Sequence, residues 1–300
     1  MTQKMAPKNQ LITAGGQAVI EGVLIRSAKK MAIAVRAPNK KIVLTTERVV
    51  PYSTRHRLFG IPIIRGVATM AEMLVTGIRA LQHSANIALG EEEELTFWNM
   101  FFSLLFSFAL VIILFKVVPL LVAQLMTTVF DTVKNHYLLF NLIDGGVRIL
   151  LFLAYLYCIS FMADVKRLFM YHGAEHKAVH CYEHFKGDLK KVTVANVQKH
   201  PPEHPRCGTS FIIIVLLLSV LVYTFIPKTL SFGWKLGLRL LLLPLIAGIS
   251  YEVLKFSAKH LDHPLMRLVT WPGLLVQKIT TKEPTNDMVE VAIKALKAAV

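Results

Sequence analysis

The chain has 300 residues, 54% of them hydrophobic and 18% charged, and a mean hydropathy of +0.51. This composition argues against a purely soluble globular protein, in which about 25% of residues are charged. The net charge of +15 would suit a nucleic-acid partner, but a membrane protein with basic cytoplasmic segments carries the same excess. Three widely spaced cysteines give no disulfide framework, and no secretory leader pattern opens the chain, so we do not expect a secreted protein.

Residues 1–57 are predicted to form a β-rich N-terminal subdomain on the cytoplasmic side. Three stretches have the composition of strands: 17–27, 31–37 and 41–50. The turn signal Pro38-Asn39-Lys40 separates the last two, so we expect a small antiparallel sheet. The pair Gly15-Gly16 before the sheet is typical of a simple turn, although glycine pairs also occur where a backbone cradles a phosphate.

Residues 58–96 are predicted to form amphipathic or interfacial helices. Within 61–89, polar residues recur about every seven positions in an otherwise apolar run, which is the pattern of a helix with a thin polar stripe. We expect this helix to lie on the membrane surface or beneath a transmembrane bundle. A re-entrant segment is the alternative.

The region 97–256 is predicted to contain about four transmembrane helices, each of roughly 20 residues. The apolar stretches are 97–130, 147–165, 209–227 and 236–255. The last one contains Arg239, Pro244 and Glu252, so a buried soluble helix is the alternative there. The expected fold class is a polytopic α-helical membrane protein with a small N-terminal antiparallel β-subdomain and cytoplasmic amphipathic helices.

The distribution of Lys and Arg predicts the orientation of these spans. Thirteen lie in residues 1–96, eight in 166–208 and seven in 255–300, against one in 131–146 and two in 228–235. Because positively charged loops remain in the cytoplasm, we expect both termini there, with interfacial and amphipathic helices over 257–300. This topology explains the basic charge. The expected partners are therefore the lipid bilayer and other membrane proteins rather than nucleic acid, and the oligomeric state stays open.

The loop 166–208 between the second and third spans contains the candidate chemical site. Histidines recur there at every fourth position, on one face of a helix: His172, His176, His180 and His184. The segment 172–176 also spells H-x-x-E-H, the order found in inverted zinc peptidases, where two histidines hold zinc and the glutamate acts as base. Glu175 is therefore the candidate catalytic residue.

A second cluster lies just before the third span. His204 and Cys207 supply an imidazole and a thiol three residues apart, Glu203 lies beside them, and nearby prolines stiffen the loop. We expect zinc or another divalent transition metal, with His172, His176, His204 and Cys207 as the candidate ligands. The alternative is that the histidines form a solvated face of an amphipathic helix and that Cys207 is a packed thiol.

Four segments resemble the YqhQ family of bacterial membrane proteins: GGQAVIEGVLIRS at 15–27, HGAEHKAVHCYE at 172–183, HPRCGTSF at 204–211 and PGLLVQKITTKEPTNDMVEVAIKAL at 272–296. The resemblance implies a multi-pass protein of the bacterial cytoplasmic (inner) membrane. It also implies a metal-dependent enzyme, as the family is sometimes described. Its signature positions here are Glu175, His176, Glu183, His204 and Cys207. Glu183 thereby joins Glu203 as a supporting residue of the candidate site.

Two functions of different classes fit these residues. The first is a metal-dependent hydrolase acting on a lipid headgroup or a juxtamembrane peptide, with Glu175 taking a proton from water. The second is a non-catalytic scaffold or assembly factor, in which the His/Cys cluster is a structural clip between two spans. An open coordination position would favour the enzyme and a closed four-ligand site the scaffold. A transporter is a weaker alternative, because the spans carry few polar groups.

Overall fold

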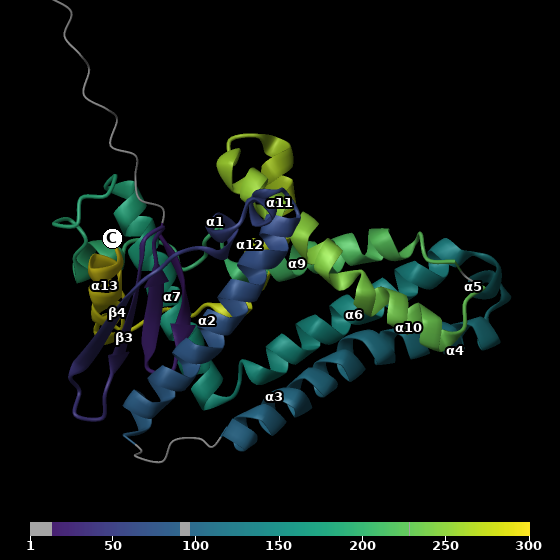
Figure 1. Ribbon diagram of the computed structural model, residues 1–300, viewed down its shortest axis with the longest axis horizontal. Helices are drawn as coiled ribbons and strands as arrows, with labels where there is room; N and C mark the ends of the chain where they lie inside the picture. The colour runs from purple at the N-terminus through teal and green to yellow at the C-terminus, as the bar shows by residue number, and fades with distance from the viewer. Residues whose placement is uncertain (1–13, 91–96, 228) are drawn as a thin grey trace, which may run out of the picture.

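The computed structural model describes residues 14–90, 97–227 and 229–300. Figure 1 shows a body that combines a sheet with helices from distant parts of the chain, and an elongated helical bundle that extends from it. The sheet has four antiparallel strands in chain order: β1 (Gly15–Val19), β2 (Gly22–Arg26), β3 (Lys30–Arg36) and β4 (Ile42–Arg48). The small N-terminal antiparallel sheet is therefore confirmed.

The helices follow the sheet in the chain. Those before the His/Cys loop are α1 (Tyr52–Arg55), the 3₁₀ helix η1 (Arg57–Gly60), α2 (Ile64–Leu89), α3 (Phe97–Ile112), the π-helical turn η2 (Ile113–Val117), α4 (Val118–Val129), α5 (Asp131–Asn135) and α6 (Tyr137–Ile159). The others are α7 (Ala163–His184), α8 (Val194–Val197), α9 (Gly208–Tyr223), α10 (Phe232–Leu241), α11 (Leu243–Lys259), α12 (Pro264–Thr280) and α13 (Asn286–Ala299).

The predicted first strand, 17–27, is wrong in detail because this stretch folds as a hairpin. A two-residue turn at Ile20 and Glu21 reverses the chain and places Val19 opposite Gly22. Glu21, the second residue of this turn, has a φ of 52°, which lies in the left-handed region.

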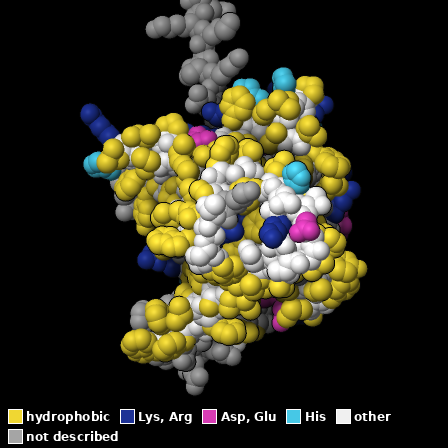
Figure 2. Space-filling model, turned by 90° about the vertical axis from the view of Figure 1, so that its right-hand side faces the viewer, with side chains coloured by type: hydrophobic (Ala, Val, Ile, Leu, Met, Phe, Trp, Pro, Cys, Tyr) yellow, Lys and Arg dark blue, Asp and Glu magenta, His cyan; other side chains and the backbone are white. Residues whose placement is uncertain are grey.

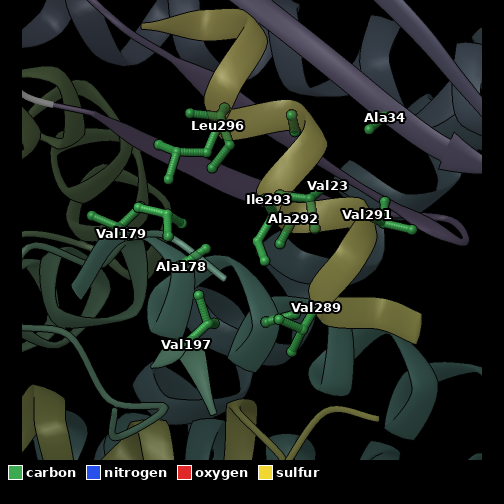
Figure 3. Packing of buried hydrophobic residues seen from close by; sticks show 14 of the residues in the cluster. Val23, Ala34, Ala178, Val179, Val197, Val289, Val291, Ala292, Ile293 and Leu296 are labelled. Carbon is green, nitrogen blue, oxygen red and sulfur yellow. The ribbon is translucent and has the colours of Figure 1, made fainter. Parts of the chain in front are cut away.

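Helix α13 covers one face of the sheet and packs against α7 (Figure 3). Its buried apolar residues recur with helical spacing: Val289, Ala292, Ile293 and Leu296. They share one buried cluster with Val23 and Ala34 of the sheet and with Ala178 and Val179 of α7. The helix predicted for 286–299 is confirmed. The core of the body thus joins residues from both ends of the described chain.

Helix α2 covers the opposite face of the sheet. Its Ala80 is buried among the apolar strand residues that alternate with those facing α13. The buried carboxylate of Glu72 pairs with Arg26 at 2.6 Å. Further along, α2 packs so closely on α11 that a Cβ on Gly66 would lie 2.7 Å from the carbonyl oxygen of Gly248. The predicted helix over 61–89 therefore forms and connects the sheet to the bundle (Figure 1).

Two helices of the bundle are long and apolar enough to cross a membrane, Phe101–Val129 and Tyr137–Ile159. Helices α10 and α11 make a third candidate if the pair, bent by 41°, counts as one span. Helix α9 is apolar but has only 16 residues. Large apolar side chains are exposed along the bundle, and in Figure 2 they surround a smaller polar patch. The described residues therefore contain two or three candidate spans, whereas the sequence predicts about four.

The second span begins earlier than predicted. Helix α6 starts at Tyr137 and not near residue 147, so much of the expected loop 131–146 is helical. Asp144 and Arg148 both lie within this helix, where they pair with each other one turn apart and are both 1% exposed. Arg239 of α10 donates to the same carboxylate. Polar residues enter the bundle here because they satisfy one another.

Candidate metal centre

Helix α7 presents His172, Glu175 and His176 on one side. The ring centroids of the two histidines lie 4.3 Å apart, as the four-residue spacing predicts. The N-terminal turns of α7 come directly after α6, so the site lies close to the end of a candidate span.

Both histidines are oriented by backbone carbonyl groups. Nδ1 of His172 lies 2.8 Å from the carbonyl oxygen of Thr280, and Nδ1 of His176 lies 2.6 Å from that of Pro202. A carbonyl oxygen can only accept, so each Nδ1 must carry the hydrogen. Each Nε2 is therefore left with a free lone pair, which is the arrangement of metal-binding histidines in proteins. Burial and the neighbouring histidines hold the pKa of His176 well below its usual value, which keeps this imidazole neutral.

Cys207 completes the group from the start of α9. Its Sγ lies 3.3 Å from Nε2 of His172, and it accepts hydrogen bonds from the backbone N–H and the hydroxyl of Thr209. Burial raises the pKa of this thiol, against the lowering effect of the groups at the helix N-terminus. Ligand atoms of His172, His176 and Cys207 all lie within 4.8 Å of one another. Ligands around one tetrahedral zinc are about 3.5 Å apart, so small side-chain adjustments would suffice.

Glu175 supplies an unsatisfied carboxylate beside this group. The residue is 3% exposed, and its Oε2 has no hydrogen-bond partner within the described parts of the chain. This oxygen lies 3.7 Å from Nε2 of His176, a contact that is not an ion pair because the imidazole is neutral. Burial raises the pKa of Glu175 to about 8, although His172 and the backbone N–H of Gly16 lower it. A buried carboxylate oxygen without a partner, next to three ligand atoms, fits a site that holds a cation.

His204 lies beside the three-residue group but outside it. Its Nδ1 accepts from the backbone N–H of Arg206 at 3.2 Å, and its Nε2 lies 3.6 Å from Glu183. Glu183 also pairs with the Arg206 guanidinium, so it anchors the loop that carries Cys207. Glu203 contributes its carbonyl oxygen, which lies 2.7 Å from Nε2 of His180.

The remaining histidines continue as a row away from the three-residue group. The ring of His180 lies 4.5 Å from that of His204, and the ring of His184 lies 5.3 Å from that of His200. Burial lowers the pKa of His180 and of His204 to about 4. The predicted four-histidine ladder is therefore divided between two neighbourhoods, and only its first half faces Cys207.

Two positioning residues were not found from the sequence. Gln277 of α12 is fully buried; its Oε1 accepts from the His204 N–H at 2.7 Å, and its Nε2 donates to the His204 carbonyl oxygen. Gly173 lets the chain after α12 lie against α7, because a Cβ there would be 2.1 Å from the Lys282 carbonyl oxygen. That approach brings the Thr280 carbonyl to His172. The only sequence signal for Gln277 is a lone amide among apolar residues of a predicted interfacial helix.

A cavity of about 700 Å³ opens onto the three-residue group. Strand β1 and helices α2, α7 and α9 contribute its walls. Met70, Met73 and Leu74 line it from α2, and Phe211 and Ile212 from the first turns of α9. The cavity therefore has ligand atoms on one side and an apolar wall on the other, beside the start of an apolar helix.

Comparisons with known proteins give a family but no activity. Residues 61–300 match the model of a protein family of unknown function, DUF1385. The chain is 32% identical over 295 residues to the "Uncharacterized protein YqhQ" of Bacillus subtilis (strain 168), which covers 94% of this chain and 90% of that protein. No solved structure matches the chain. Neither description mentions a metal or an enzyme, so that part of the expectation gains no support. The chain belongs to the DUF1385 family, which confirms the resemblance to YqhQ.

Proposed function

We propose that this protein is a metal-dependent hydrolase of the cytoplasmic (inner) membrane, with its site at the cytoplasmic face. The observation that carries the proposal is the convergence of His172, His176 and Cys207 next to Glu175, whose Oε2 has no hydrogen-bond partner among the described residues. Both histidines carry their hydrogen on Nδ1 and leave Nε2 unprotonated, and the third candidate ligand lies 35 residues beyond His172 in the chain.

The architecture of the body supports a four-crossing topology. Three parts of the chain contribute to the body: the residues before α3, those between α6 and α9, and those after α11. If the body lies on one side of the membrane, the chain must cross an even number of times between the first and second parts, and again between the second and third. The first interval contains the two candidate spans α3–α4 and α6. The second contains α9 and the bent pair α10–α11, so α9 must cross if that pair does. Its helical length is about 24 Å, and the apolar residues that follow to Pro227 extend it. The basic charge of the body supports a cytoplasmic location for it.

A metal held by His172, His176 and Cys207 would have the ligand number of a catalytic rather than a structural zinc site. Three protein ligands leave one position for water, and a bound metal lowers the pKa of that water to about 7. With a metal held by these three residues, Glu175 would take a proton from water through Oε2. The hydroxide portion would add to the electrophilic carbon or phosphorus, and Glu175 would return the proton to the leaving group. The position of the cavity beside α9 suits a lipid headgroup or a juxtamembrane peptide.

A structural clip is the second candidate function, and one distance favours it. Oε2 of Glu175 lies 3.7 Å from Nε2 of His176, close enough for the carboxylate to become a fourth ligand after a small movement. A closed site of that kind would join α7 to α9 in a scaffold or assembly factor and leave no position for water.

Metal content and coordination number test the proposal. In detergent-purified protein we expect about one transition-metal ion per chain, lost in His176→Ala and Cys207→Ala and retained in Glu175→Ala. His184→Ala is the control, because His184 lies on the same helix outside the three-residue group. X-ray absorption should show three protein ligands and one water. A closed set that includes Glu175 would support the clip, and the absence of metal after reconstitution would reject both.

A further inference from the structure

The cavity beside the metal centre lies at the open edge of the sheet. Among the residues that the structure describes, strand β1 pairs with β2 alone, because the strand order is β1-β2-β3-β4. Helix α2 covers one face of the sheet, while α7 and α13 cover the other. Residues of both α2 and α7 line the cavity together with β1. Helices on opposite faces can share a cavity with an edge strand only where the sheet ends.

The register of the hairpin shows which backbone groups face outward. A two-residue turn makes Val19 and Gly22 a hydrogen-bonded pair, so alternate residues of β1 bond to β2. Gly16 and Ala18 therefore direct their N–H and C=O groups away from β2. The hydrogen bond from the Ile20 N–H to the Ser84 hydroxyl follows the same alternation.

The outward backbone groups of β1 lie beside the metal centre. Gly16 lies close enough to Glu175 to affect its pKa, and both residues line the cavity. Ala18 lies one outward position further along the same edge and also lines the cavity. A chain that paired with this edge would therefore run directly past Glu175 and the ligand atoms of the three-residue group.

We propose that the cavity takes an extended polypeptide segment, which adds to β1 as a fifth strand and brings a peptide bond beside Glu175. This inference rests on the proposed function and names its substrate class. Strand addition provides main-chain hydrogen bonds for affinity and pockets for alternate side chains. Here one set of side chains meets the apolar wall of Met70, Met73 and Leu74, so the segment recognised is apolar at alternate positions.

A polypeptide fits the edge better than a lipid acyl chain does. The acyl chain would cover the N–H and C=O groups of Ala18 without bonding to them, and burying unpaired backbone groups is unfavourable. A polypeptide satisfies them. A lipid is therefore a distinct outcome of the test below.

The test uses the full chain in vesicles of phosphatidylethanolamine and phosphatidylglycerol. The probe is a mixture of short peptides of Ala, Leu, Val and Phe that carry one photoreactive benzoylphenylalanine. We expect crosslinks to β1, α2 and the start of α9. N-methylation at every peptide nitrogen should reduce them about tenfold or more, because the bonds to β1 are lost. N-methylation at alternate positions is the matched control and should be tolerated, since one edge of the strand stays free.

Two variants and a lipid probe complete the experiment. Leu74→Trp fills the apolar wall and should reduce crosslinking, whereas Val75→Trp, an exposed neighbour that does not line the cavity, should not. Equal crosslinking by unmethylated and fully methylated peptides, or displacement of the peptides by a diazirine-bearing phosphatidylglycerol, would overturn the inference. His176→Ala should lose the metal and keep the methylation pattern. Failure of the proposed function is thereby distinguished from failure of strand addition.

Discussion

The Sγ of Cys207 lies 3.3 Å from Nε2 of His172, although 35 residues separate them in the chain. The contact joins the helix that follows the second candidate span to the first residue before α9. The loop between them returns along α7 and is anchored by Glu183 and Gln277. The candidate site is therefore a product of tertiary closure and not of the H-x-x-E-H segment alone.

The cysteine contact predicts a thiolate signature. Cobalt(II)-substituted protein should show a sulfur-to-cobalt charge-transfer band in its absorption spectrum, because Cys207 would be a direct ligand. Cys207→Ser should abolish the band, while Cys181→Ser, a buried thiol outside the group, should retain it. A band that persists without Cys207 would remove this residue from the ligand set.

Gly173→Ala should destabilise the protein by about 1–3 kcal/mol, because the added Cβ would meet the Lys282 carbonyl oxygen at 2.1 Å. The displaced chain would also withdraw the Thr280 carbonyl from His172, so metal affinity should fall. Gly208→Ala is the control, since a Cβ there meets nothing within 4 Å. Thermal unfolding in detergent and competition with a metal chelator measure the two effects. Equal behaviour of the two variants would argue against close packing at Gly173.

Gln277→Leu should reduce metal affinity about tenfold and destabilise the protein by about 1–3 kcal/mol. The substitution removes two hydrogen bonds to His204 and one to Ser210, and it leaves the buried His204 N–H without a partner. Chelator titration and thermal unfolding measure both quantities. Gln277→Glu keeps the acceptor for the N–H and should recover part of the loss. An unchanged affinity in Gln277→Leu would mean that the loop position does not depend on α12.

Asp144→Asn should destabilise the bundle by about 3–5 kcal/mol, because two buried arginines would lose the carboxylate that they share. Asp131→Asn is the control at an exposed position and should change stability by at most about 0.5 kcal/mol. Aggregation temperature in detergent gives the comparison. If both variants were equally stable, the arginines would have to be satisfied by other groups.

The orientation of the spans is tested by thiol labelling of intact cells. In a Cys158→Ser background, a membrane-impermeant maleimide should label Lys134→Cys and should not label Lys190→Cys. Both lysines are exposed, so accessibility of the side chain does not distinguish them. Labelling of position 190 from outside would contradict a cytoplasmic site.

The spacing and composition of nearby residues in the sequence were enough to predict the helices that pack against one kind of environment. The apolar residues of α13 repeat with helical spacing. The stretch that forms α3 and α4 is so long and apolar that a membrane span is its simplest interpretation. The start of α6 was missed because Asp144 and Arg148 look unfavourable until their partners are known. The β1–β2 hairpin was missed because Ile20 and Glu21 are not typical turn residues.

Part of the candidate site could likewise be predicted from local spacing, and the rest depends on contacts between distant residues. The four-residue spacing placed His172 and His176 together on α7, and the structure adds Cys207. The different surroundings of His204 depend on Arg206, Glu183 and Gln277, of which the last is 73 residues away in the chain. Such contacts produce no repeating pattern that could be recognised in a single sequence. The free edge of β1 likewise follows from strand order and not from the composition of any strand.

The shared core of the sheet and α13 also has a consequence for biosynthesis. The sheet residues are made first, but the face that they bury against α13 stays uncovered until residues 286–299 have been synthesised. All candidate spans are translated in the interval between them. Under the proposed topology, insertion of the candidate spans into the bilayer would therefore begin before the body folds. A chain truncated ahead of α13 would insert but leave an apolar sheet face exposed, which makes it a substrate for chaperones and quality-control proteases.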